Sequence, residues 1–334
     1  MKKNNLNNGA SGFNGSFLVE EAIKKDYRVF AGIRNYSSRQ YLKDPGIHFL
    51  ELDFSNSDSL DISLRNFAGK YGNFDFIIHN AGITKAKNSH PFDLVNFENT
   101  NRFVHALQRN QLVPGKFIYI SSVASFGPGE NTRPISALHT RRPLTAYGRS
   151  KLKAEEFLYT TRDFPFLIIN PTAVYGPREK DVFFLLKSIE KHLEVYIGTT
   201  QQLLSFIHVQ DLCEAVFLSM ESTALNQNLL VSDFGVYTAK EFNHMVKKNL
   251  NKRTVSFILP VSLVRIVAFL SECMGRIRGE IPVLNRERLK EFEAKNWGVD
   301  CTDISKLGFI PQFSLEEGLK QTIGWYKKQG WMKG

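Results

Sequence analysis

The sequence has few cysteines and no long hydrophobic run. Cys213, Cys273 and Cys301 are widely spaced and form no CxxC pair, so they indicate neither a zinc site nor a disulfide framework. The first residues lack the apolar core of a signal peptide, and the most apolar later stretch, residues 256–274, contains a proline and an arginine and is too short to span a bilayer comfortably. We therefore expect a soluble, cytoplasmic protein without a metal and without stable membrane insertion.

Blocks of basic residues are also absent. The 334-residue chain has a formal net charge of +10, but it contains no run of five Lys or Arg residues, and its basic residues are interleaved with acidic ones. This pattern argues against nucleic acid as a partner. It fits a protein that needs a few local cations for a phosphate-bearing cofactor or substrate.

Short apolar runs alternate with amphipathic stretches up to about residue 180. The runs cover residues 28–33, 48–52, 74–79, 117–120 and 166–169, and helical spacing covers residues 16–25, 59–71, 94–110 and 146–161. The alternation predicts an α/β fold with a doubly wound parallel sheet. We expect a nucleotide-binding domain over residues 1–180 and a smaller, mostly helical substrate lobe over residues 181–334, with some strands returning to the main sheet.

Beyond residue 180 the pattern is less regular. It predicts helices over residues 183–192 and 209–220, a strand over residues 204–209 and a run of helices over residues 239–288. We expect this lobe to pack beside the carboxyl ends of the strands, where open α/β sheets bind their ligands.

Three glycines follow the first predicted strand. Gly9, Gly12 and Gly15 in GASGFNG are spaced three apart, and a helix and a second apolar strand come after them. Such a turn lets the backbone approach a pyrophosphate, which then lies at the N-terminus of the helix. The spacing in this context predicts a dinucleotide site.

The end of the second predicted strand, RVFAGIRNYSSR, carries no carboxylate. An NAD-preferring enzyme usually places an acidic residue there for the adenosine ribose. Here Arg34, with Ser37 or Arg39, is placed to meet a 2′-phosphate, which favours NADP while NAD remains open. Asp53, after the third strand, is placed to touch the adenine.

Tyr147 and Lys151 in AYGRSK are four residues apart, so they share one face of the predicted helix. Ser122 ends a buried strand 25 residues upstream. The unperturbed pKa of tyrosine, about 10, is too high for acid–base work at neutral pH, and a nearby ammonium lowers it. The three residues predict hydride transfer to or from a nicotinamide, with Ser122 holding the reacting oxygen.

The chain resembles the extended short-chain dehydrogenase/reductases, which form the NAD-dependent epimerase/dehydratase superfamily. The resemblance rests on GASGFNG, on HNAG at residues 79–82, on YGRSK, on NPTAVYGP at residues 170–177 and on SFIHVQDL at residues 205–212. It covers nearly the whole chain. The tail LGFIPQFSLEEGLKQTIGWYKKQGW and Arg34 are most similar to the branch of dihydroflavonol reductases and 3β-hydroxysteroid dehydrogenase-like proteins.

The resemblance implies a Rossmann-type nucleotide-binding domain and a homodimer face on the helices over residues 94–110 and 146–161. It implies Ser122, Tyr147 and Lys151 as the catalytic residues. The cofactor residues it implies are Gly9, Ser11, Gly12, Phe13, Gly15, Arg34, Asp53, Phe54, Asn80, Ala81, Gly82, Asn96, Ser121, Tyr147, Lys151, Pro171, Thr172 and Val174.

Three functions are open. A reductase would reduce a small-molecule carbonyl with NADPH; Arg34 favours it, and so do Leu203 and Leu204, which precede SFIHV where sugar-nucleotide enzymes often carry an arginine. An NAD-dependent epimerase or dehydratase would act on a nucleotide sugar. A homologue without catalysis would only bind the nucleotide.

Asparagine occupies several positions at which the family has another residue type. Asn4, Asn5, Asn7 and Asn8 surround Leu6 in the strand before the glycine turn, where the family has an apolar strand that ends in threonine. Further replacements are Asn14 for an apolar residue, Asn99 for a glycine and Asn170 for an arginine. A buried amide without partners costs about 1–3 kcal/mol. Either the amides are hydrogen-bonded, or the strand is frayed, or asparagine is not the natural residue at these positions.

Overall fold

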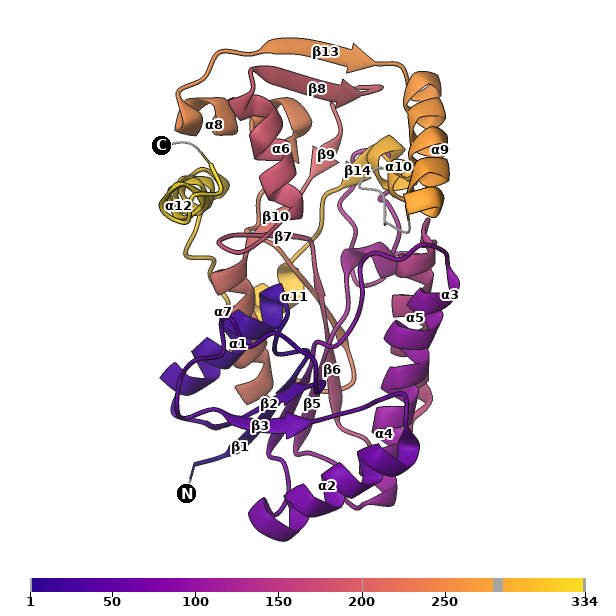
Figure 1. Cartoon of the computed structure of the whole chain (residues 1–334), viewed down its shortest axis with the longest axis vertical. Coiled ribbons are helices and arrows are strands. Elements are labelled where there is room, and N and C mark those ends of the chain that lie inside the picture. Colours follow the sequence, from indigo (N-terminus) through magenta and orange to yellow (C-terminus); the bar gives the residue numbers. More distant parts are fainter. Residues whose placement is uncertain (1, 200, 279–284, 333–334) are drawn as a thin grey trace.

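The computed structural model describes residues 2–199, 201–278 and 285–332. A sheet of seven parallel strands, in the order β11-β6-β5-β4-β1-β2-β3, lies in the lower half of Figure 1. Its strands are β1 (Asn4–Asn8), β2 (Arg28–Ile33), β3 (His48–Glu51), β4 (Phe76–His79), β5 (Lys116–Ile120), β6 (Phe166–Pro171) and β11 (Asn228–Val231). The order reverses between β1 and β4, and a crevice opens at such a switch point in doubly wound sheets.

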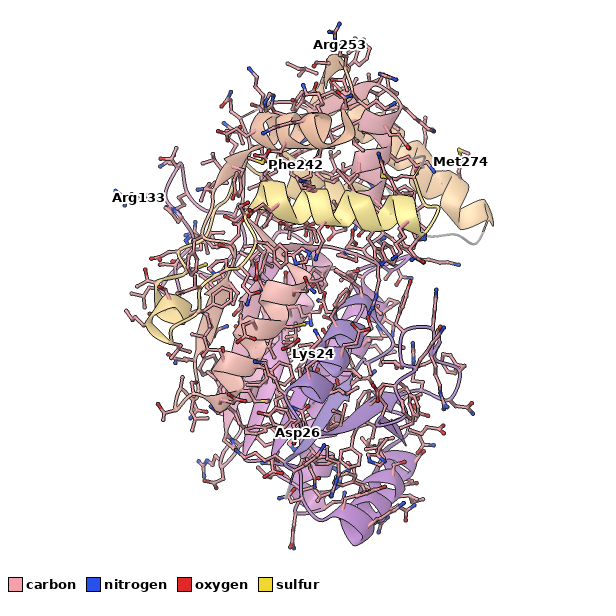
Figure 2. The ribbon with its side chains drawn as sticks, turned by 90° about the vertical axis from the view of Figure 1, so that its left-hand side faces the viewer. Lys24, Asp26, Arg133, Phe242, Arg253 and Met274 are labelled. Carbon is pink, nitrogen blue, oxygen red and sulfur yellow. The ribbon has the colours of Figure 1, made fainter. Side chains whose placement is uncertain are left out.

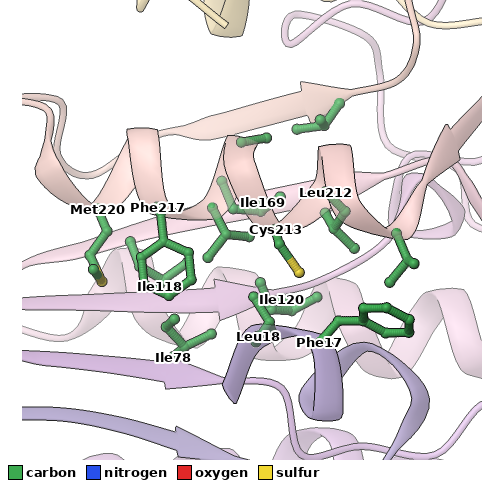
Figure 3. Packing of buried hydrophobic residues seen from close by; sticks show 14 of the residues in the cluster. Phe17, Leu18, Ile78, Ile118, Ile120, Ile169, Leu212, Cys213, Phe217 and Met220 are labelled. Carbon is green, nitrogen blue, oxygen red and sulfur yellow. The ribbon is translucent and has the colours of Figure 1, made fainter. Parts of the chain in front are cut away.

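Helices cover both faces of the sheet (Figure 1). One face is covered by α1 (Phe13–Lys24), α7 (Val209–Glu221) and α11 (Thr302–Lys306), and the other by α2 (Ser57–Tyr71), α4 (Asn99–Arg109) and α5 (Ala146–Thr160). In Figure 3, Phe217 of α7 and Leu18 of α1 pack on Ile118 and Ile120 of β5. A short helix α3 (His90–Phe92) and a π-helical turn (Asp93–Glu98) lead into α4. The predicted doubly wound α/β fold is confirmed.

Most of the chain after β6 builds the upper part of the molecule in Figure 1, whereas α7, β11 and α11 belong to the sheet below. The helices of the upper part are α6 (Asp181–Glu190), α8 (Ala239–Leu250), α9 (Val261–Arg278), α10 (Arg286–Glu293) and α12 (Leu315–Lys328). Its short strands are β7 (Ala173–Tyr175), β8 (Leu193–Ile197), β9 (Leu203–Leu204), β10 (Phe206–His208), β12 (Tyr237–Thr238), β13 (Val255–Leu259) and β14 (Asn296–Trp297). A second core of aromatic and aliphatic side chains joins α6, α8 and α12. Strand β11 returns to the main sheet from this half of the sequence, while a domain boundary at residue 180 stays a prediction.

The predicted run of helices over residues 239–288 is wrong in its middle. Helix α8 ends at Leu250; the next residue, Asn251, has a left-handed φ of 52°, and residues 255–259 form strand β13 beside β8. The run VSFIL is rich in β-branched and aromatic residues and is closed by Pro260, so a strand suits it better than a helix. The predicted strand over residues 204–209 is likewise divided between β9 and β10, and residues 279–284 lie outside the described residues.

Strand β1 is ordered and buried at all five positions, and its outer asparagines are hydrogen-bonded. The side-chain amide nitrogen of Asn4 donates to the backbone carbonyls of Tyr71, the last residue of α2, at 3.0 Å and of Asn73 at 2.9 Å. Asn8 Oδ1 accepts the backbone N–H groups of Asn80 (3.1 Å) and Ala81 (3.0 Å), and its Nδ2 lies 2.7 Å from His79 Nδ1. Burial lowers the pKa of His79 to about 3, so the ring is neutral and accepts this bond.

The asparagines on the opposite side of β1 are less well paired. Asn7 Nδ2 donates to Asn5 Oδ1 at 2.7 Å, and Asn5 Nδ2 donates to the thioether sulfur of Met220 at 3.3 Å, a weak acceptor. The side-chain oxygens of Asn7 and Asn14 are buried and have no hydrogen-bond partner among the described residues. Hydrogen bonding therefore accounts for Asn4 and Asn8, while Asn5, Asn7 and Asn14 destabilise the fold.

We predict that replacing Asn5 and Asn7 together by leucine, which has nearly the same shape, raises the free energy of unfolding by about 1–3 kcal/mol. The replacement removes an unpaired carbonyl and a weak sulfur contact from the core. Asn8→Leu is the matched control. We expect it to lower the free energy of unfolding, because two backbone N–H groups lose their acceptor. Urea unfolding of the three proteins measures both effects; a double variant no more stable than the parent would contradict this account.

Candidate active site

A cleft of about 1310 Å³ lies over the carboxyl ends of the central strands. It is larger than most small-molecule pockets and has room for a dinucleotide. The predicted residues that line it are Gly9, Ser11, Gly12, Phe13, Arg34, Asp53, Phe54, Asn80, Ala81, Gly82, Ser121, Ser122, Tyr147, Lys151, Pro171, Thr172 and Val174. Gly15 and Asn96 are not among the lining residues, and their place along the cofactor stays a prediction.

The glycine turn packs the end of β1 closely against the end of β4. Gly9 has a left-handed φ of 68°, and a Cβ atom there would lie 2.7 Å from the backbone nitrogen of Ala81. A Cβ atom on Gly15 would lie 2.1 Å from the carbonyl oxygen of Gly9, so Gly15 lets α1 pack on the turn instead of facing the cleft. Gly12 caps α1 without any side-chain bond or acidic residue in the first turn, which leaves the helix N-terminus suited to an anion.

Arg34 marks the far end of the cleft, beyond β2. Its backbone N–H donates to Ser37 Oγ at 3.1 Å, and both residues line the cleft. Arg39, the other predicted cation, stacks on the ring of Phe49 at 4.2 Å and is not part of the lining. Asp53 lies near Arg34, and hydrogen bonds from a neighbouring serine lower the pKa of this carboxyl. This end of the cleft therefore holds an arginine and a carboxylate from adjacent strands.

Asn96 supports the loop that follows β4. Its side chain is fully buried; Oδ1 accepts the backbone N–H of Ile83 at 2.8 Å, and Nδ2 donates to the Ser150 hydroxyl at 3.0 Å. The amide thus joins this loop to α5. Asn96 positions the wall that Asn80, Ala81 and Gly82 form, and it has no face on the cleft itself.

Ser122, Tyr147 and Lys151 converge on one wall of the cleft. Ser122 follows β5, and the other two occupy the first two turns of α5, so the strand end and the helix start bring them together. The Ser122 hydroxyl is hydrogen-bonded to the Tyr147 phenol. Lys151 Nζ donates to the carbonyl of Ile120 at 2.8 Å and lies beside the cleft wall, where a Cβ atom on Gly82 would come within 3.4 Å of it.

The protonation of this group differs from the sequence-based expectation. Burial raises the pKa of Tyr147 to about 12, against the opposing effect of the Ser122 hydrogen bond. Burial lowers the pKa of Lys151 to about 8, although Glu155 opposes the shift. The Lys151 ammonium is directed at Ile120 and at the ring of Tyr119, 4.8 Å away, so desolvation dominates and the predicted lowering of the phenol pKa is not found. Tyr147 is a protonated phenol at neutral pH.

A buried polar network lies behind Ser122. Glu155 of α5 accepts hydrogen bonds from Arg141 (2.8 Å), Asn170 (2.8 Å) and Asn228 (2.9 Å), and also from the hydroxyl of the serine that precedes Ser122. Arg141 is the cation of this network and forms an ion pair with Glu155. Sequence reasoning missed Arg141 because it lies in an irregular loop.

Helix α10 closes the cleft above α5, and sequence reasoning missed this contribution too. Glu287 accepts the backbone N–H of Ala146 at 2.7 Å, and Glu291 accepts the Thr145 hydroxyl at 3.1 Å. Both carboxylates line the cleft next to Tyr147. The partners are more than 140 residues apart in the chain, so no local pattern could have indicated them.

Comparisons with known proteins agree with this geometry. The sequence model of the NAD dependent epimerase/dehydratase family matches residues 8–231. An Escherichia coli O157:H7 protein named N-acetyl-alpha-D-glucosaminyl-diphospho-ditrans,octacis-undecaprenol 4-epimerase is 27% identical, over 97% of this chain and 95% of its own length. A Dictyostelium discoideum sterol-4-alpha-carboxylate 3-dehydrogenase, decarboxylating, is 24% identical over 96% of this chain and 99% of its own.

Solved structures share the fold. The UDP-glucose 4-epimerase of Thermus thermophilus, solved in complex with NAD, superposes with a TM-score of 0.77 at 17% identity, covering 97% of this chain and 99% of its own. The expected membership of the extended short-chain dehydrogenase/reductases is confirmed. The chain therefore belongs to the NAD dependent epimerase/dehydratase family, a family of extended short-chain dehydrogenase/reductase enzymes.

Proposed function

We propose that this chain transfers hydride between a nicotinamide dinucleotide and a carbinol or carbonyl carbon of its substrate. The observation that supports the proposal most strongly is the convergence, on one cleft, of a glycine turn suited to a pyrophosphate and of Ser122, Tyr147 and Lys151. Such a cleft lets the chain hold the cofactor and deliver a proton to the same reacting centre.

The nicotinamide supplies the site for the hydride when the cofactor is bound. The N-terminus of α1 would hold the pyrophosphate, and Lys151 would hold the ribose next to the nicotinamide. Tyr147, protonated at neutral pH, donates its proton to the carbonyl oxygen as the carbon is reduced. Ser122 donates a hydrogen bond to that oxygen, and in the oxidative direction the phenolate form of Tyr147 takes the proton back.

Carbonyl reduction with NADPH is the first candidate for the net reaction. Arg34 lines the end of the cleft where an adenosine 2′-phosphate would lie, and no carboxylate follows β2 directly. Leu203 and Leu204 form strand β9 and do not line the cleft, so this segment brings no cation for a sugar diphosphate.

Epimerisation with NAD is the second candidate, in which the hydride is removed from the substrate and then returned to it. Family membership supports it, and so do the name of the E. coli relative and the NAD bound to the T. thermophilus structure. The names of the two curated relatives include an undecaprenol and a sterol. We therefore propose that the substrate of this chain carries an apolar group.

The catalytic assignment predicts that Tyr147→Phe lowers kcat by about 10²–10⁴-fold, because one proton donor is lost from the cleft. Tyr27→Phe is the matched control: its hydroxyl bonds Glu221 away from the cleft, so its activity should stay at the parental level. Turnover is followed with NADPH and a long-chain 3-ketoester, and with NAD and UDP-N-acetylglucosamine. Parental activity in Tyr147→Phe would refute the assignment.

The two candidate reactions differ in what happens to the cofactor. A reductase consumes NADPH in proportion to product and is purified without nucleotide. An epimerase retains NAD, which mass spectrometry of the denatured protein detects, and it interconverts two diastereomers without net change in the cofactor. Retained NAD together with epimer formation would overturn the first candidate and establish the second.

Arg34→Glu should raise the KM for NADPH by about 10–100-fold, the effect of losing one charge-assisted hydrogen bond and gaining a repulsive charge, and leave the KM for NADH nearly unchanged. Arg39→Glu is the control, because that side chain stacks on Phe49 outside the cleft lining. Initial rates with both cofactors measure the difference. An equal change for NADPH and NADH would show that Arg34 does not meet the 2′-phosphate.

A further inference from the structure

Helix α9 exposes a broad apolar surface. Its buried side is narrow: Val264 and Ala268 pack on Leu289 of α10. The rest of the helix presents large apolar side chains to solvent, each between 48% and 58% exposed: Leu263, Ile266, Val267, Phe269, Leu270 and Met274. We call these six residues the α9 face. A water-soluble helix usually turns its apolar stripe inward, whereas this one turns most of its apolar residues outward.

The strand pair before α9 has the same inverted pattern. Strands β8 and β13 are parallel and in register, and Leu193, Val195, Val255 and Phe257 are exposed on one side of the pair. The alternate residue Glu194 is 2% exposed and accepts hydrogen bonds from Lys247 (2.8 Å) and Ser256 (2.9 Å). These bonds help to lower its pKa to about 2 against the effect of burial. The pair therefore buries a carboxylate and exposes apolar residues, whereas a strand pair usually buries apolar residues and exposes polar ones.

Positive charge accompanies this apolar surface. Residues 251–278 contain five basic residues and one acidic residue in the sequence, and one of the five, Arg265, is paired with Glu293 of α10 at 2.9 Å. Lys252 and Arg253 are exposed in the turn that leads into β13, and Arg253 lies at the top of the molecule in Figure 2, where Met274 marks the outer end of α9. An apolar helical face flanked by basic residues is the composition of helices that lie in the surface of an anionic membrane.

The same helix reaches the cleft. Glu272 of α9 lines the cleft and pairs with Arg286 of α10 at 3.0 Å, while the α9 face points away into solvent. A surface to which the α9 face binds would therefore lie next to the substrate end of the cleft. None of the described helices is long and apolar enough to cross a membrane. Binding would have to be along the surface.

We propose that the α9 face and the exposed side of β8–β13 dock this chain on the surface of an anionic lipid bilayer. The apolar side chains enter the boundary of the acyl region, and Lys252 and Arg253 meet the lipid headgroups. A second copy of the chain is a poorer occupant, because two identical surfaces with the same excess of positive charge repel each other. The proposal extends the proposed function, since it gives an apolar substrate a route to the cleft, but it does not depend on which hydride reaction occurs.

Flotation of the full chain with vesicles tests the docking. We expect it to float with vesicles of phosphatidylcholine and phosphatidylglycerol, to bind vesicles of phosphatidylcholine alone at least ten-fold more weakly, and to be released by high salt. Ile266→Ser/Leu270→Ser should weaken binding about ten-fold or more through lost apolar burial. Leu138→Ser/Ile310→Ser, at two highly exposed positions outside this surface, is the matched control and should bind like the parent.

Three results would overturn the proposal. The parent could fail to bind anionic vesicles, or the Ile266/Leu270 variant could bind them like the parent. Light scattering could also show a parental dimer that this variant converts to a monomer without any vesicle binding, which would assign the surface to self-association. Thermal melting of each variant confirms folding, and hydride transfer to a water-soluble carbonyl reports the proposed function separately, since neither substituted side chain lines the cleft.

Discussion

The contact between the ends of β1 and β4 determines the geometry on which the cleft depends. Gly9 turns with a positive φ against the backbone of Ala81, at a distance that no side chain tolerates. Asn8 reinforces the contact through two backbone N–H groups beyond β4. Because the strand order reverses at this pair, the turn that suits a pyrophosphate and the wall that leads to Lys151 are held in one rigid arrangement. Asparagine is unfavourable inside a strand, but at the end of β1 the Asn8 side chain stabilises the contact with the end of β4.

Two further supports bring the chemistry to this contact. The buried Glu155 network, with Arg141 as its cation, holds the segment around Ser122. The carboxylates of α10 hold the first turn of α5, which contains Tyr147. The same upper part that supplies α10 also exposes the α9 face. The proton donor and the proposed membrane surface are therefore linked through three helices: α5 is hydrogen-bonded to α10, and α10 packs on α9.

Local patterns in the sequence predicted the parallel sheet and the residues of the cleft. The apolar runs mark buried strands, and parallel strands must end at a common edge, so Ser122, Tyr147 and the glycine turn were expected to meet there. Strand β13 was missed because its partner β8 lies some 60 residues earlier, and the contribution of Arg141 was missed because only the folded chain brings it to Glu155. The pKa of Tyr147 was also out of reach, because burial raises it and the Lys151 ammonium is directed at the carbonyl of Ile120.

The central claim is that this cleft binds a nicotinamide dinucleotide although β1 carries asparagines. Calorimetric titration of the unmodified chain with NADPH and with NADH tests it most directly. The account predicts saturable binding at one site per chain, with NADPH bound more tightly. A chain that unfolds cooperatively, and so is folded, yet shows no heat of binding with either nucleotide would contradict it.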